Sequence, residues 1–470
     1  MDNDERRPPN PQAPLEGAPS TANSDFSVVS RQIFALALPA LGALVAEPLF
    51  TFIDSAMVGH LGTAQLAGMS LASQIIQTVV VLFIFLAYST TSLTARAFGA
   101  GDPGRAVRAG VSAIWLAAGL GIASAIGLVL ATSPLTKAMT VDGSLLPHAN
   151  AYLWASAPGL VGMLMSFAAV GTLRGFQDTT TPLIVTGVGA AVNVALNALL
   201  IYGLGWGIAG SGAGTSATQL AMAGVYCTII ARRAHRLAVP LTPDTSGIFA
   251  AAKDGAPLIV RGLALRMAGL ATIWPVSRLG SEPLAAYQVV LTVWTLTAFI
   301  LDALAIAAQS LVGLAIGQGE RTRLRTLLRV LALWGAAAGA LLAVLVAIVS
   351  PLLPRLFGSE AGMWPIATWG LIAAGFGLPF AALVFMLDGV LLGAGDNRFF
   401  AVAGVLQLLV YLPSLAFIDS MRQAGASAQV VVAAVWFAYG FVYIGARTVS
   451  NVWRTWFTPV ILDPPAPAGR

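Results

Sequence analysis

The sequence predicts an all-α membrane protein with twelve transmembrane helices in two six-helix bundles. Three observations support this: the chain is 57% hydrophobic, only 10% of its residues are charged, and its mean hydropathy is +0.82. Soluble proteins carry about 25% charged residues, so the composition excludes an ordinary cytosolic globular enzyme. Lipid is therefore expected to be the main solvent of the folded chain.

Twelve apolar segments, separated by clusters of Gly, Pro, Asp and Arg, follow the polar N-terminus. Each has at least the ~20 residues that a helix needs to cross about 30 Å of hydrocarbon. The predicted spans are 31–58, 64–94, 106–131, 147–173, 182–204, 209–231, 255–278, 283–315, 326–350, 363–392, 399–418 and 427–449. Around them we expect a disordered tail at 1–30, bundles at 31–235 and 255–450, a linker at 236–254 and a second tail at 451–470.

Lys and Arg are distributed unequally between alternate loops. The side that holds both termini carries nineteen, and the opposite side carries four, namely Lys137, Arg278, Arg355 and Arg422. Because positively charged loops stay in the cytoplasm, this bias predicts a multi-pass plasma-membrane protein with both termini cytoplasmic. The basic residues lie between apolar runs, where they meet lipid head groups, so nucleic acid is not an expected partner.

An internal repeat is the most informative feature of the sequence. The offset that aligns Gly62 with Gly280 also brings two further blocks into register: Ser92, Gly99 and Asp102 onto Ser310, Gly317 and Glu320, and Gly171, Gly175 and Asp178 onto Gly389, Gly393 and Asp396. Six spans per repeat is an even number, so the halves are related by a pseudo-two-fold axis along the membrane normal. Two such bundles around a cleft predict alternating access to a site near the midplane.

Asp54 and Glu47 are the acids of the first span. They are separated by about two helical turns, so both carboxylates share one face, with Pro48 between them. A charged side chain in a span costs about 2.5–3.5 kcal/mol on insertion scales, so it must face a cavity or a partner. We predict that both take part in proton coupling; the alternative is a buried acid that only bridges helices.

Asn193 and Asn197 lie one helical turn apart on one face of the fifth span. Their amides can bind a carboxyl group, a substrate or an ion in a cavity. They can equally join neighbouring helices by hydrogen bonds. Both interpretations remain open at this point.

Charged residues also occur in the second half. Asp302 lies in the eighth span and Asp388 in the tenth, while Arg261 and Arg266 enter the seventh span from the inner side. Similar depth predicts that Arg261 pairs with Asp388 and Arg266 with Asp302. Such ion pairs would lock the second bundle, or they would form a second coupling site in which Asp302 lines the cavity.

Other features support fewer conclusions. Gly210 and Gly214, in GSGAGTS, are interpreted as positions of close helix packing. Trp274, beside a proline, is a candidate for the cavity wall. The single cysteine and the three scattered histidines predict no metal site, and no cofactor is expected.

The run ALPALGALVAEPLFTFIDSAMVGHLGTAQLAG, together with GTLRGFQDTTTP at 171–182 and VNVALNALLIYG at 192–203, resembles the multidrug and toxic compound extrusion (MATE) family. LDALAIAAQSLVG and LDGVLLGAGD further resemble its DinF-like branch. The resemblance covers residues 31–450. It implies twelve helices and export of organic cations or amphipathic toxins in exchange for protons or sodium.

The resemblance also assigns residues. Asp54 matches the acid of the first helix implicated in proton coupling, and Asn193 matches an asparagine of the fifth helix. Asn197 stands where several members have a second aspartate, which weakens a sodium site and leaves Glu47 as the only substitute acid. We therefore expect a proton-coupled antiporter, acting as a monomer on cationic or amphipathic small molecules. A sodium-coupled antiporter, a lipid-linked precursor flippase, a channel and a membrane enzyme are the alternatives.

Overall fold

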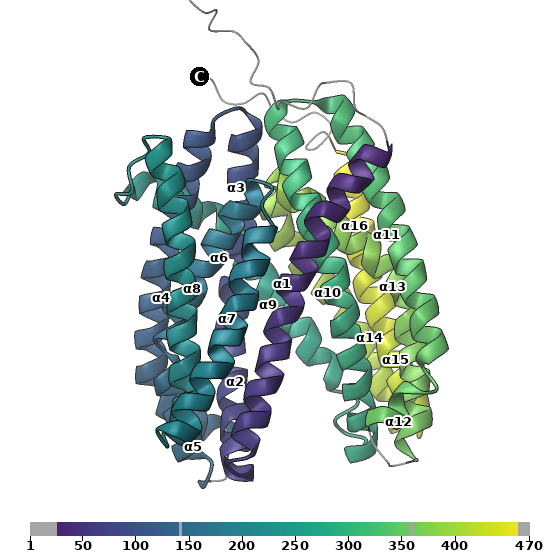
Figure 1. Ribbon diagram of the computed structural model, residues 1–470. Helices are drawn as coiled ribbons and strands as arrows, with labels where there is room; N and C mark the ends of the chain where they lie inside the picture. Colours follow the sequence, from purple (N-terminus) through teal and green to yellow (C-terminus); the bar gives the residue numbers. More distant parts are fainter. Residues whose placement is uncertain (1–25, 141–142, 358–360, 459–470) are drawn as a thin grey trace, which may run out of the picture.

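The computed structural model describes residues 26–140, 143–357 and 361–458, without the side chain of Glu47. Within these ranges the chain is almost entirely helical (Figure 1). The first half contains α1 (Phe26–Gly59), α2 (Thr63–Phe83), α3 (Phe85–Gly99), α4 (Pro103–Met139), α5 (Leu146–Ser156), α6 (Gly159–Gly175), α7 (Thr180–Ala198), the π-helical turn η1 (Leu199–Gly203) and α8 (Gly207–Arg236). The second half contains α9 (Thr245–Ile273), α10 (Ser281–Gln318), α11 (Arg321–Val349), α12 (Leu353–Phe357), α13 (Met363–Ala394), α14 (Asn397–Gln423), α15 (Ala428–Ala438), η2 (Tyr439–Tyr443) and α16 (Ile444–Trp456).

The number of membrane spans comes close to the predicted twelve. The described residues contain ten helices long and apolar enough to cross a membrane, or eleven when the bent pair α5–α6 counts as one span. The predicted span 209–231 falls on α8, which has 30 residues but does not meet the same test. Its Gly, Ser, Thr and Gln residues make it less apolar, so the twelfth span depends on α8.

Three predicted spans are interrupted helices. The second is α2 followed by α3, and the last is α15 and α16 joined by η2. The fourth is α5 and α6, which meet at an angle of 48°. Pro158 lies at this bend and has no backbone N–H to continue the helical hydrogen bonds.

The described parts of the predicted tails are helical. Helix α1 already begins at Phe26, and α16 continues to Trp456. The prediction that residues 1–30 are disordered was therefore wrong from Phe26 onward, whereas the tail predicted at 451–470 begins within α16. The remaining tail residues lie outside the described residues.

The linker is shorter than the predicted 236–254. Helix α8 ends at Arg236, and α9 begins at Thr245, because the Asp244 side chain accepts a hydrogen bond from the backbone N–H of Ser246 and caps the helix. The intervening residues cross α4, where the Trp115 indole N–H donates to the carbonyl of Leu241 at 2.9 Å.

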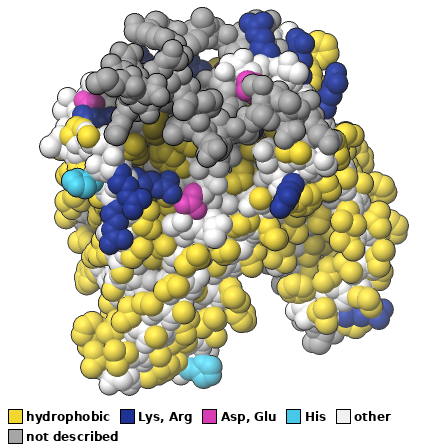
Figure 2. Space-filling view, turned by 45° about the horizontal axis from the view of Figure 1, so that its top comes forward, with side chains coloured by type: hydrophobic (Ala, Val, Ile, Leu, Met, Phe, Trp, Pro, Cys, Tyr) yellow, Lys and Arg dark blue, Asp and Glu magenta, His cyan; other side chains and the backbone are white. Residues whose placement is uncertain are grey.

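The two halves form two bundles, α1–α8 and α9–α16 (Figure 1). The bundles meet at the end where α1 starts and α16 ends, and they separate toward the end where α5 and α12 lie. Figure 2 shows the same separation as a hollow between two lobes, whose surfaces are largely hydrophobic. A hydrophobic outer surface is what a lipid solvent requires.

The contact between α3 and α10 displays the pseudo-two-fold axis directly. A Cβ atom added to Gly99 would overlap the backbone oxygen of Leu314, and one added to Gly317 would overlap that of Arg96. The offset of the internal repeat aligns Gly99 with Gly317, and it likewise aligns Arg96 with Leu314. The equivalent residues of the two repeats therefore exchange equivalent contacts, and only glycine permits backbones to approach so closely.

The first helix of each bundle begins against the other bundle. The Trp334 indole N–H of α11 donates to the Ser30 hydroxyl of α1 at 3.0 Å, and its ring meets Phe34 edge-on at 4.6 Å. Helix α9 begins in the same way against α4, where a Cβ atom at Gly247 would press on Ser112. These crossings connect the bundles at the end where they meet.

Candidate functional site

Asp54 lies inside the first bundle, where α1, α7 and α8 meet. Only 5% of the residue is exposed. One of its oxygens, Oδ1, accepts hydrogen bonds from the Asn197 amide at 2.9 Å and from the Ser211 hydroxyl at 2.7 Å. Asn197 also donates to Asn193, at 3.2 Å, so the two predicted asparagines share one network with Asp54. We call these four residues the Asp54 cluster.

Ser211 was not among the predicted site residues, although it lies in the GSGAGTS run. The glycines of that run do serve helix packing, because a Cβ atom at Gly210 would lie 2.9 Å from the backbone of Leu200 and one at Gly214 would overlap Asn197. This close approach of α8 to α7 brings the Ser211 hydroxyl to Asp54. Alternation of glycines with hydroxyl residues on one helix face was the signal available in the sequence.

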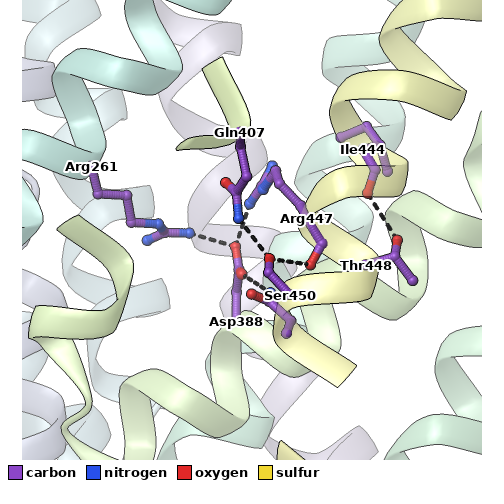
Figure 3. Close-up of polar contacts among 8 residues, drawn as sticks. Arg261, Asp388, Gln407, Ile444, Arg447, Thr448 and Ser450 are labelled. Carbon is purple, nitrogen blue, oxygen red and sulfur yellow. Dashed lines mark hydrogen bonds and ion pairs between the residues drawn. The ribbon is translucent and has the colours of Figure 1, made fainter. Parts of the chain in front are cut away.

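The second bundle buries a carboxylate of a different kind. The Asp388 Oδ2 atom of α13 accepts hydrogen bonds from the guanidinium groups of Arg261 on α9 and Arg447 on α16, the second at 2.5 Å. Its other oxygen accepts from the Asn451 amide at 2.7 Å. Figure 3 shows the two arginines approaching Asp388 from different helices. We call these four residues the Asp388 cluster.

The expected pairing of Arg261 with Asp388 is therefore present, with a partner that the sequence did not indicate. By sequence, Arg447 counts among the arginines of the cytoplasmic side, but only 6% of it is exposed. It lies one helical turn beyond the π-helical turn η2, inside the bundle. Because Arg447 lies near the end of the last predicted span, the sequence alone does not distinguish it from a loop residue.

The expected pairing of Arg266 with Asp302 was wrong. No ion pair of Arg266 occurs within the described residues, and the cations that act on the Asp302 carboxylate are Arg174 and Arg261. Similar depth in the membrane predicted only one of the two pairs correctly. Arg261 and Arg266 lie on different sides of α9, so only one of them can face Asp388.

Two further predicted residues take no part in these clusters. Trp274 ends α9 with 41% exposure, and the Arg278 guanidinium lies 4.9 Å from its ring centre. It is absent from the linings of the two cavities described below, so its assignment to a cavity wall stays a prediction. Glu47 belongs to α1, but its side chain lies outside the described residues.

Two cavities lie near the middle of the molecule. One, of about 350 Å³, is lined by both bundles and includes Arg261, Asp388 and Arg447. The other, of about 680 Å³, lies on the side of the first bundle and includes Thr51, Ser55 and Arg174. The linings of both include Val81, Ile84, Tyr88 and Asp302. Asp302 thus faces the cavities, as expected, whereas Asp54 lies behind the wall that its own helix forms.

Hydrogen bonds between the bundles close these cavities at the end where the two bundles meet, which is the cytoplasmic end in the predicted orientation. The Gln309 amide donates to the Tyr88 carbonyl at 2.7 Å, and the Ser92 hydroxyl donates to the Gly393 carbonyl at 3.2 Å. The Gln177 amide donates to the Ser310 hydroxyl at 2.6 Å. Together with the crossing at Gly99 and Gly317, they form what we call the inner seal.

No group of three or more His, Cys, Asp or Glu side chains that could hold a metal ion occurs in the described part of the chain. The acids of the two clusters are surrounded by amide, hydroxyl and guanidinium donors instead. Donors of this type satisfy the lone pairs of a carboxylate by hydrogen bonds.

Two repeated bundles that enclose cavities and carry buried charged residues are the architecture of a membrane transporter. The family model described as MatE matches the chain twice, at residues 39–199 and 257–418. The offset of the internal repeat superposes the starts of the two matches. The chain belongs to the MATE family.

Relatives and solved structures agree with this assignment. The chain is 31% identical to Protein DETOXIFICATION 44, chloroplastic, of Arabidopsis thaliana, over 91% of this chain and 82% of that protein. It is 26% identical to DNA damage-inducible protein F of Escherichia coli (strain K12), over 82% and 86%. A crystal structure of a mutant of the Vibrio cholerae MATE transporter VcmN is similar in fold, with a TM-score of 0.82, 18% identity, and 93% and 99% coverage.

Proposed function

We propose that this protein is a proton-coupled multidrug exporter of the plasma membrane that works by alternating access as a single chain with both termini cytoplasmic. Relatives named as multidrug resistance proteins support the export of drugs: the chain is 26% identical to NorM of Thermotoga maritima and to MdtK of Edwardsiella ictaluri.

The Asp54 cluster is the observation that carries the proposal. Asp54 is a buried acid whose hydrogen-bond partners are all neutral, and no ion pair to it occurs within the described residues. Its charge is therefore held by hydrogen bonds alone. A carboxylate in that setting can exchange a proton without breaking an ion pair.

Asn197 is suited to both protonation states of Asp54. Its amide N–H₂ now donates to the carboxylate, while its amide oxygen is buried without a hydrogen-bond partner. Once Asp54 carries a proton, the amide can rotate and accept a hydrogen bond from the new O–H group. The cost of neutralising Asp54 is offset by this exchange of donor and acceptor.

Helix α1 connects the proton site to the cavity. Asp54 faces α7 and α8, while Thr51 and Ser55 of the same helix line the 680 Å³ cavity. A change in the hydrogen bonds of Asp54 that shifts α1 also reshapes the cavity wall. Substrate and proton would then favour different conformations, which is the condition for coupling.

In the proposed orientation, the conformation described above is outward-facing. The inner seal closes the end that carries most of the Lys and Arg side chains visible in Figure 2, and the hollow opens at the other end. A solved MATE transporter structure titled as outward-facing has a similar fold, with a TM-score of 0.80 and 18% identity over 93% of this chain and 98% of that one. In this state, protons and substrate would exchange with the outside.

Proteoliposomes provide the test. Ethidium efflux should follow an imposed pH gradient in the wild type and fall to the background of empty liposomes in Asp54→Asn, because the amide cannot exchange a proton. Asp54→Glu should retain part of the activity. Active pH-driven extrusion by Asp54→Asn would contradict the proposal.

A separately imposed sodium gradient distinguishes the coupling ion. We expect no ethidium efflux under a sodium gradient at equal pH on both sides. Efflux driven by sodium alone would replace proton coupling with sodium coupling and leave the transporter assignment intact.

A further inference from the structure

The Asp388 cluster contains more hydrogen-bond donors than acceptors. A guanidinium carries five N–H donors. Arg261 and Arg447 each use one of them, on the same oxygen of Asp388, and no other side-chain hydrogen bond of either residue occurs within the described residues. Asp388 accepts three hydrogen bonds, counting the one from Asn451 on its other oxygen, so at most one of its about four lone-pair sites remains for these donors. The unused donors require acceptors that this cluster does not supply.

The unused donors are accessible from a cavity. Both Arg261 and Arg447 line the 350 Å³ cavity. Among the described residues, the side-chain polar atoms that are fully buried without a hydrogen-bond partner include none of Arg261 or Arg447. This volume lies within the range of about 300–1,000 Å³ for small-molecule sites. Arg261 is held in place from behind, with its guanidinium 4.4 Å from the ring centre of Phe400.

The charged residues that line the two cavities, taken together, are also net positive. Five charged residues line the two cavities: Arg174, Arg261, Arg447, Asp302 and Asp388. Three cations against two anions leave a formal excess of one positive charge. The ion pairs place Arg261 and Arg447 with the single acid Asp388, so the Asp388 cluster by itself has a formal excess of one positive charge, while Asp302 is the other acid of the 350 Å³ cavity.

Apart from Asp302, Gln309 and the Asp388 cluster, the 350 Å³ cavity wall is apolar and aromatic, with Phe85, Trp294 and Phe385 among its residues. Such a wall accepts a planar hydrophobic body, and the arginine pair accepts one anionic group. Guanidinium groups match the geometry of carboxylates, with which they form charge-assisted hydrogen bonds.

We propose that Arg261 and Arg447 form a subsite for the carboxylate of an amphipathic aromatic substrate. The inference narrows the substrate class of the exporter proposed above, and rests on that proposal only for the statement that the bound molecule is transported. It predicts that the transporter discriminates in favour of carboxylates over organic cations of the same shape.

Binding to the purified full chain tests the subsite without any ion gradient. The probes are 2-naphthoate and 2-naphthylmethyltrimethylammonium, which share a ring and differ in charge. Equilibrium dialysis against phosphatidylcholine nanodiscs at pH 7, with empty nanodiscs subtracted, should give at least about tenfold tighter binding of the carboxylate, as one charge-assisted hydrogen bond predicts. Tighter binding of the cation by the wild type would overturn the inference.

Variants of one helix provide the matched comparison. Arg261→Gln should weaken naphthoate binding by about tenfold to a hundredfold, and Arg261→Lys should recover part of it. Arg266→Gln is the control, since Arg266 lies on the same helix and lines neither cavity. An equal loss for Arg261→Gln and Arg266→Gln would contradict the assignment.

The outcomes remain separable from those of the export proposal. Absence of naphthoate binding, with ethidium export that depends on Asp54, would reject the subsite alone. Binding that depends on Arg261, without pH-driven export, would reject proton coupling alone. If Arg261→Gln does not fold, the preference of the wild type between the two probes still decides the question.

Discussion

The two bundles share a fold but hold their buried carboxylates in opposite ways. Asp54 is bound by an amide and a hydroxyl, whereas Asp388 is bound by two guanidinium groups and an amide. Removal of the first carboxylate would leave only neutral neighbours. Removal of the second would leave two buried cations without their counterion. The two repeats thus differ in whether neutral donors or cations surround the buried acid.

The same difference is visible at equivalent positions. At the offset of the internal repeat, Asp54 and Asn193 correspond to Thr272 and Tyr411, whose hydroxyl groups are 3.0 Å apart. Tyr411 belongs to an aromatic cluster with Tyr439 and Tyr443 that fills the second bundle. The position of the acid in one repeat is therefore neutral and tightly packed in the other.

The largest expected effect on stability comes from removing the charge of Asp388. Asp388→Asn should destabilise the protein by about 3–5 kcal/mol, the typical cost of leaving a buried ion pair without one partner. Asp54→Asn should cost about 1 kcal/mol or less, because its neutral neighbours can still donate to an amide oxygen. Thermal unfolding of the purified proteins measures both, and equal losses would show that the two carboxylates do not differ as described.

An intermediate effect is expected at the pseudo-two-fold axis. Gly99→Leu and Gly317→Leu should each cost about 1–3 kcal/mol by overpacking, and both should force the inner seal apart. Spin labels at Arg105 and Thr322, on a background with Cys227 replaced by serine, report the separation of the bundles at that end. An equal increase in the distance between the labels in both variants would show that the two repeats respond symmetrically when the bundles separate. An increase in only one variant would show that the symmetry holds for the static fold alone.

The smallest effect is expected at the start of α9, outside the membrane-spanning segments. Hydrogen bonding by Ser246, chiefly from its hydroxyl, lowers the pKa of Asp244, and the nearby Arg108 contributes in the same direction. The stabilisation by this carboxylate is therefore complete above the ordinary Asp pKa of about 3.9 and is lost as the pH falls below it.

Asp244→Ala should accordingly increase hydrogen exchange in the first turn of α9 without affecting α1, the corresponding helix of the other bundle. Asp244→Asn should change little, because asparagine caps helices equally well. Faster exchange in α1 as well would show that the crossings of the two first helices are coupled.

Features that depend on local composition or on a regular spacing could be predicted from the sequence. Apolar segment length predicted the spans, a constant offset predicted two related bundles, and a spacing of one helical turn placed Asn193 and Asn197 on one helix face. These properties follow from the pitch of the α-helix and the thickness of the bilayer, which are the same for every membrane protein.

The partners of the buried charges were decided only by tertiary structure. Arg447 joins Asp388 from α16, which the whole of α14 and α15 separates from α13 along the chain. Ser211 reaches Asp54 across a glycine-lined contact, and the Trp274 ring packs against the Arg278 guanidinium. Each outcome depends on the rotation of a helix about its own axis and on its distance from neighbours remote in the chain. Small residues and ion pairs between helices set those two quantities, and hydropathy along one segment contains no information about either.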